Sequence, residues 1–172
     1  GESYSYQLAD YETCIVPATG SIDVQVQNQT FKQVGKRQHI WEGNPEGVYI
    51  PVDCKATLSC VSDAVEVFIS GAKHNQTHSA FVIREDDIDT VQYGSDDTKT
   101  HRKIKHILGA NHHDKVGRLL CNELYTVGQG GWSGFPPHKH DTDRLPKETR
   151  HDETYNYRFK PNNGFGFQLF QA

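Results

Sequence analysis

The sequence predicts an all-β protein of sandwich or barrel type, and three observations support this fold class. Apolar and polar residues alternate with a period of two through much of residues 1–92, which is the pattern of half-buried strands. Turn-forming residues interrupt this alternation at short intervals, as is typical of a sandwich or barrel. No amphipathic helix of convincing length lies between the turns.

The strand patterns of the first part are clearest at residues 22–26 and 65–69, where valine and isoleucine occupy every second position. Alternate side chains of a strand point to the same face, so each segment is expected to bury one face. Turns are expected at residues 18–20, 42–47 and 70–71, which are rich in glycine, proline or asparagine. The polar stretch 93–103 then breaks the pattern.

Strand patterns resume at residues 119–127, 153–159 and 165–170. We therefore expect a first barrel at residues 1–92, a connection at 93–108 and a second barrel at 109–172. A β-sandwich domain usually takes about 100 residues, whereas about 65 follow the connection. The second unit is expected to be incomplete, with partner strands from elsewhere or with the sequence being a fragment.

Composition and charge exclude several classes of protein. Charged residues make up 23% and hydrophobic residues 35% of the chain, which indicates a folded protein. The net charge of −4 and the lack of a Lys/Arg stripe oppose nucleic-acid binding. Because no run approaches the roughly 18 apolar residues of a membrane span and no leader is visible, we expect a cytoplasmic protein without a membrane partner. The 4 cysteines lack CxxC spacing, so reduced thiols are expected.

The strongest chemical signal is the segment 130–141, which contains His138 and His140. Two positions apart on a strand, these imidazoles would share a face and lie close enough to bind one ion. After a polar loop, Glu153 begins an aromatic strand. If the two strands pair as a hairpin, its carboxylate joins the imidazoles. Two imidazoles and a carboxylate with an open position suit a catalytic Zn²⁺, Mn²⁺ or Fe²⁺.

The sequence also allows other roles for the histidines. A His-x-His pair also arises by chance in a chain with 10 histidines, and a pair on a surface loop would carry no function. His151 shares a face with Glu153 and is a candidate fourth ligand. His112 and His113 fall in a turn and are expected to be solvated. The remaining histidines have no partner at metal-site spacing: His39, His74, His78, His101 and His106.

The segment 130–141, with the order Gly-x-Trp-Ser-x-x-Pro-Pro-His-Lys-His-Asp, resembles the signature of the 5-deoxy-glucuronate isomerase family. The glutamate that opens an aromatic strand and the Gly-Phe-Gly-Phe-Gln of residues 164–168 extend the likeness. The resemblance implies two cupin barrels in one chain, with a metal in the second barrel held by His138, His140 and Glu153. The first half has no His-x-His followed by a glutamate, which agrees with the metal-free first barrel of that family.

The sequence also departs from the family pattern. It ends before the family's fourth ligand, a histidine on a late strand, and its beginning lacks the family's leading segment. Relatives often carry a tyrosine and a histidine where this chain has Asn156 and Tyr157, so substrate preference could have drifted. A carboxylate substrate calls for a cation, but Arg158 and Lys139 point away from the expected site by strand parity.

The resemblance implies an isomerase that converts 5-deoxy-glucuronate to 2-deoxy-5-keto-gluconate in myo-inositol catabolism, with Zn²⁺ or Mn²⁺ favoured as its ion. Such a metal would act as a Lewis acid while a side chain relays a proton. Tyr155 and Tyr157 are the catalytic candidates, although aromatic residues inside a barrel are more often core. The rivals are a 4-deoxy-5-keto-uronate isomerase of pectin breakdown and a non-catalytic sugar-binding cupin. The expected partner is a uronate, and a homo-oligomer is left open.

Overall fold

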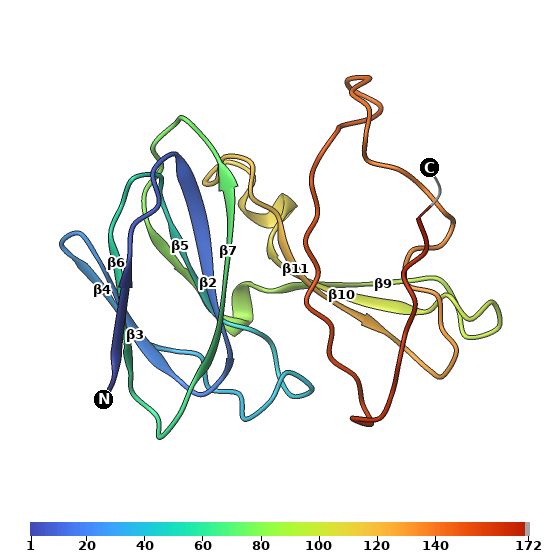
Figure 1. The fold of residues 1–172 in the computed structure, drawn as a ribbon, viewed down its shortest axis with the longest axis horizontal. Helices are drawn as coiled ribbons and strands as arrows, with labels where there is room; N and C mark the ends of the chain where they lie inside the picture. The colour runs from blue at the N-terminus through green and yellow to red at the C-terminus, as the bar shows by residue number, and fades with distance from the viewer. Residues whose placement is uncertain (171–172) are drawn as a thin grey trace. The chain divides into compact units, whose positions relative to one another are not determined.

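The computed structural model describes residues 1–170, and the predicted all-β class is confirmed over that range. The chain divides into two compact units, Gly1–Ser133 and the residues from Gly134 onward. All named strands belong to the first unit, called unit 1 below (Figure 1). No helix among the described residues is long and apolar enough to cross a membrane.

Unit 1 contains two four-stranded antiparallel sheets and one three-stranded sheet (Figure 1). The first sheet has the order β1 (Ser3–Tyr6), β6 (Ala56–Cys60), β3 (Ile22–Val26) and β4 (Gln29–Val34). The second has the order β7 (Glu66–Lys73), β2 (Tyr11–Thr19), β5 (Gly47–Ile50) and β8 (Phe81–Ile83). The third has the order β11 (Cys121–Thr126), β10 (Arg102–Leu108) and β9 (Asp89–Tyr93). Two short 3₁₀ helices are η1 (Glu85–Asp87) and η2 (Ala110–His112).

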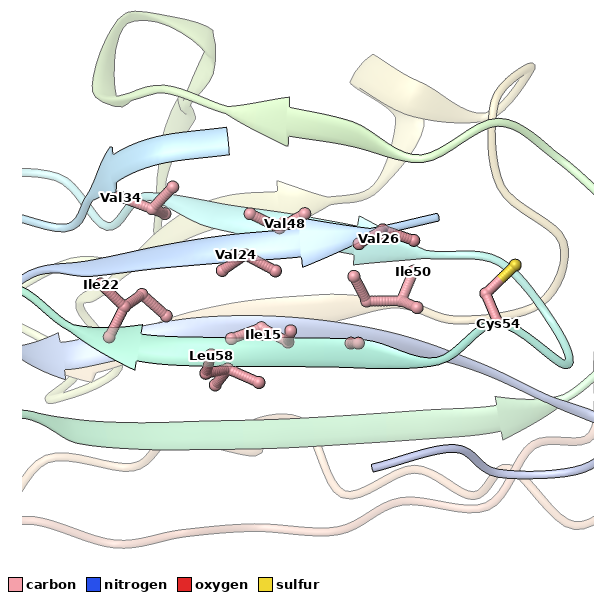
Figure 2. Packing of buried hydrophobic residues seen from close by; sticks show 10 residues of the cluster. Ile15, Ile22, Val24, Val26, Val34, Val48, Ile50, Cys54 and Leu58 are labelled. Atoms are coloured by element: carbon pink, nitrogen blue, oxygen red, sulfur yellow. The ribbon is translucent and has the colours of Figure 1, made fainter. Parts of the chain in front are cut away.

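The first hydrophobic core lies between the two four-stranded sheets. The predicted alternation of residues 22–26 is confirmed, because Ile22, Val24 and Val26 of β3 are all buried in this core. They pack together with Ile15 of β2 and Ile50 of β5, which come from the opposite sheet (Figure 2). The expected strand at residues 65–69 also forms, as part of β7.

A second core lies on the other face of β2 and β5. Cys14 and Tyr49 are fully buried there with Ile107 and Leu108 of β10. Because β2 and β5 bury both faces, nearly all consecutive residues of β2 are buried, and buried and exposed residues do not alternate along it. All four cysteines are free thiols, as expected.

Two expectations about secondary structure need correction. The expected connection at 93–108 contains β10, the central strand of the third sheet. Residues 153–159 and 165–170 form no strand, although their side chains alternate. A strand is stabilised by ladder hydrogen bonds to a neighbour, and within residues 1–170 no such ladder joins either segment to another. The division into two cupin barrels stays a prediction.

Candidate metal centre

A folded loop places two predicted site residues side by side in the unit that begins at Gly134. The backbone N–H of His151 donates to the carbonyl oxygen of His140 at 3.0 Å and closes the loop between them. Within the loop, Arg144 and Glu148 form a β-bridge. Lys139, next to His140, pairs with Asp141 at 2.7 Å and with Glu148 at 3.3 Å. These contacts lie within the loop, so we attribute the placement of His151 to it.

The grouping that results consists of His140, His151 and Glu153, whose ligand atoms all lie within 4.8 Å of one another. Oε1 of Glu153 is 3.6 Å from Nε2 of His151 and 3.9 Å from Nε2 of His140. Metal–ligand distances near 2.0–2.2 Å put neighbouring tetrahedral ligands about 3.4 Å apart. The two separations to Glu153 exceed this by a few tenths of an ångström, and all the ligand atoms lie within 4.8 Å of one another. The grouping is therefore a candidate site for a divalent ion.

His138 lies beside this grouping without belonging to it. Its ring centroid is 4.8 Å from that of His140. Its Nδ1 lies 2.8 Å from the carbonyl oxygen of Pro136. A carbonyl only accepts, so Nδ1 carries a proton, and in the neutral imidazole Nε2 then has the lone pair that a metal needs. The predicted set of His138, His140 and Glu153 therefore differs from the observed grouping, in which His151 takes the third place.

The carboxylate of Glu153 is oriented by Tyr155, whose hydroxyl donates to Oε2 at 2.9 Å. This bond occupies the oxygen that does not face the imidazoles. Partners of this kind fix ligand orientation in metal sites. The side chains of His140, His151 and Glu153 are 32%, 36% and 41% exposed, so a metal and a small substrate can reach them.

The two tyrosines differ in their relation to the grouping. Partial burial and the hydrogen bond to Glu153 raise the pKa of Tyr155 to about 12, so near neutral pH its phenol acts as a donor. Tyr157 stacks on Tyr155 at 5.8 Å between ring centroids. Its hydroxyl donates to Gln168 at 2.9 Å rather than to the grouping.

The expectation that His112 is solvated is wrong, whereas His113 is exposed as expected. His112 is 6% exposed and stacks on Phe81 at 5.3 Å, because η2 packs onto the second core. Its burial lowers its imidazole pKa. No other grouping of three metal-ligating side chains occurs within residues 1–170. What the sequence could not show was the loop closure between His140 and His151, since it depends on contacts inside a polar segment.

The chain is similar to known proteins over its whole length. A family model described as the KduI/IolB family matches residues 1–172. The chain is 36% identical over 169 residues to a 5-deoxy-glucuronate isomerase of Bacillus subtilis (strain 168), covering 98% of this chain and 60% of the relative. It is 31% identical to the enzyme of the same name from Halalkalibacterium halodurans, covering 98% and 61%.

A solved structure is also similar. It is an IolB-like protein from Salmonella typhimurium LT2, with a TM-score of 0.76 and 25% sequence identity, covering 87% of this chain and 55% of the other. The chain thus spans about 60% of the length of the curated relatives it matches.

Proposed function

The chain belongs to the KduI/IolB family, and from that membership we propose that the complete protein is an aldose–ketose isomerase that converts 5-deoxy-glucuronate to 2-deoxy-5-keto-gluconate. The observation that carries the proposal is the similarity, over 98% of the chain, to relatives named 5-deoxy-glucuronate isomerase. The convergence of His140, His151 and Glu153 supports it, because these side chains are of the types that bind a divalent ion. A place in myo-inositol catabolism, a cytoplasmic location, the absence of a nucleic-acid partner and the oligomeric state stay predictions.

The proposed ion is Zn²⁺ or Mn²⁺, held by His140, Glu153 and either His151 or His138. Imidazole and carboxylate donors suit both metals. A bound divalent ion would supply Lewis-acid stabilisation of the charge that develops on the sugar oxygens during isomerisation. The polypeptide's own part is to orient the donors: the carbonyl of Pro136 fixes one tautomer of His138, and the phenol of Tyr155 holds Glu153.

Isomerisation also requires a proton to move between adjacent carbons of the sugar, which a positioned side chain relays. A separate base must take the carbon-bound proton, because the phenol of Tyr155 is protonated near neutral pH. Of the two predicted catalytic residues, we assign to Tyr155 the role of proton donor to a sugar oxygen. Its hydroxyl is hydrogen-bonded to Glu153 at the grouping, whereas the hydroxyl of Tyr157 is bonded to Gln168. Tyr157 is assigned the supporting role of stacking on the ring of Tyr155.

The metal proposal is tested on the complete protein by measuring metal content and affinity in single and double variants. A His140→Ala, His151→Ala double variant should lose stoichiometric metal. His138→Ala and His151→Ala, compared separately, should show which imidazole is the third ligand by the larger loss of affinity. His113→Ala serves as a control, because His113 is exposed, lies outside the grouping and is hydrogen-bonded to the carbonyl of Ala110. Full metal content in the double variant would refute this site.

The substrate proposal is tested by assaying the metal-loaded protein with 5-deoxy-glucuronate and with 4-deoxy-5-keto-uronate. Turnover of the first and little of the second is the expected result. Preference for the second would identify the protein as a 4-deoxy-5-keto-uronate isomerase of pectin breakdown instead. Absence of turnover with both, despite bound metal, would support a non-catalytic cupin.

A further inference from the structure

A cavity lies in unit 1, among residues that take no part in the metal grouping. Its volume is about 430 Å³, within the range of about 300–1,000 Å³ that is usual for small-molecule sites. Besides two glycines, its lining residues carry polar or charged side chains: two serines, two glutamines, Lys36, Glu46 and Arg84. Ligand sites are usually lined mostly by apolar side chains. The polar side chains of this cavity suit a ligand that carries several polar groups.

The wall of the cavity is formed where two glycines bring backbone segments close together. Gly35 has φ +86°, and a Cβ there would lie 2.7 Å from the carbonyl oxygen of Gly20. Gly20 has φ +75°, and a Cβ there would lie 2.3 Å from the carbonyl oxygen of Ala64. Because only glycine adopts both the conformation and the approach without strain, this wall is fixed by the fold.

Arg84 is held in place by three hydrogen bonds and keeps further donors. Its Nη1 donates to the carbonyl oxygen of Gln33 and to Oε2 of Glu46, each at 3.0 Å, and its Nη2 donates to the carbonyl oxygen of Lys32 at 2.9 Å. A guanidinium has five N–H donors, so two are not used in these bonds. The side chain is 39% exposed, whereas that of Glu46 is 6% exposed. The accessible side of this ion pair is therefore the cation.

Lys36 adds a second cation to the lining. Its side chain is 57% exposed and donates one hydrogen bond, to Glu85 at 2.6 Å. An ammonium has three donors, which leaves two for a ligand. Ser21 also lines the cavity, and its buried Oγ has no hydrogen-bond partner among the described residues. Two exposed glutamines, Gln33 and Gln38, contribute amides that both donate and accept.

We propose that this cavity binds a small polyhydroxylated carboxylate of the sugar-acid class. The ligand's carboxylate would pair with Lys36 and Arg84, since charge-assisted bonds to carboxylates are the strongest available there. Its hydroxyl groups would be bound by the exposed amides of Gln33 and Gln38, which offer donors and acceptors together. The proposal does not depend on the metal centre or on the isomerase activity.

The test is a calorimetric titration of the complete protein, treated with a chelator, with D-glucuronate as the probe. D-Glucose presents similar hydroxyls without the carboxylate, and acetate presents the carboxylate alone. Glucuronate should bind at least about 10-fold more tightly than either, because a hydrogen bond to a charged group contributes about 1.5–3 kcal/mol. Equal binding of glucose or of acetate would overturn the assigned ligand class.

Variants locate the binding. Lys36→Met and Gln38→Ala change exposed side chains, and each should weaken glucuronate binding, with Lys36→Met losing about 10-fold or more. Lys32→Met is the matched control, because it removes the same charge from an exposed lysine outside the lining. His140→Ala should leave this binding unchanged while it lowers metal affinity. Unchanged affinity in Lys36→Met, or loss of binding in His140→Ala, would overturn the site, whether or not the isomerase assay succeeds.

Discussion

Two glutamates show how the two parts of the molecule use the same side chain: Glu12 in unit 1, and Glu153 just after the loop that the bond between His140 and His151 closes. Glu12 is fully buried and accepts bonds from the hydroxyl of Tyr49 at 2.6 Å and from three consecutive backbone N–H groups, at residues 117–119. The side chain of Glu153 is 41% exposed, with one bond from Tyr155 and two imidazoles near its other oxygen.

The comparison teaches that hydrogen-bond saturation separates a structural carboxylate from a candidate ligand. Glu12 has both oxygens satisfied by donors, so it ties the loop 117–119 to β2 and has no capacity left for an ion. Oε1 of Glu153 faces the imidazole nitrogens of His140 and His151, which at neutral charge can serve as further ligands. Stability is therefore expected to depend on the first unit and metal chemistry on the second.

The sharpest test of this division is Glu12→Gln. The amide keeps one acceptor oxygen but places an NH₂ group among backbone N–H donors, which leaves buried donors unpaired. Bonds to charged groups contribute about 1.5–3 kcal/mol each and unpaired buried groups cost about 1–3 kcal/mol. We expect the free energy of unfolding to fall by roughly 3 kcal/mol, measured by urea denaturation of the complete protein. Asp63→Asn, at an exposed position, is the control and should change little.

The same carboxylate should make stability depend on pH. Burial raises the pKa of Glu12, but the hydrogen bonds from Tyr49 and from residues 117–119 outweigh it and hold the pKa below its ordinary value. The unfolded chain then binds more protons than the folded one, so this contribution is fully present above the ordinary pKa of about 4.3. It is lost as the pH falls through the lower, folded-state pKa. As the pH falls through that range, the difference in the free energy of unfolding between wild type and Glu12→Gln should become smaller. A difference that does not change with pH would show that the charge of Glu12 is not its cause.

Tyr155→Phe tests the metal side of the comparison. It removes the hydroxyl that orients Glu153 and leaves the ring, so we expect Zn²⁺ affinity to fall by about 10-fold, the lower end of the range for such partners. Tyr157→Phe is the matched control, because its hydroxyl bonds Gln168 instead. Competition with a chromophoric chelator measures both. Equal losses in the two variants would mean that packing of the stacked rings, rather than the bond to Glu153, carries the effect.

The smallest expected effect is that of Phe167→Ala. Phe167 is 87% exposed, so in the structure described its truncation removes little buried surface and should change the free energy of unfolding by less than about 0.5 kcal/mol. Ile15→Ala, in the first core at 0% exposure, should cost about 2–5 kcal/mol. A large loss of unfolding free energy in Phe167→Ala would show that residues 165–170 are buried in the complete protein. Stability would then depend on both units rather than on unit 1 alone.

Much of unit 1 could be predicted from local pattern. The alternation of Ile22, Val24 and Val26 predicted β3 and its buried face, and the pattern at residues 119–127 predicted β11 (Cys121–Thr126). The same rule failed at residues 153–159 and 165–170. A period of two describes which faces a strand would have, but a strand forms only where another segment completes its hydrogen bonds.

The candidate site, too, was only partly predictable from local sequence. Residue types and spacing alone determined that His138, His140 and Glu153 offer metal donors, because imidazole and carboxylate chemistry is a property of the side chains. Only the tertiary structure decided which donors meet. The bond between His151 and His140 closes a ten-residue loop, and no periodicity records a contact made across a polar segment. Likewise, the role of Glu12 depends on backbone N–H groups more than 100 positions away, which only the folded chain brings to it.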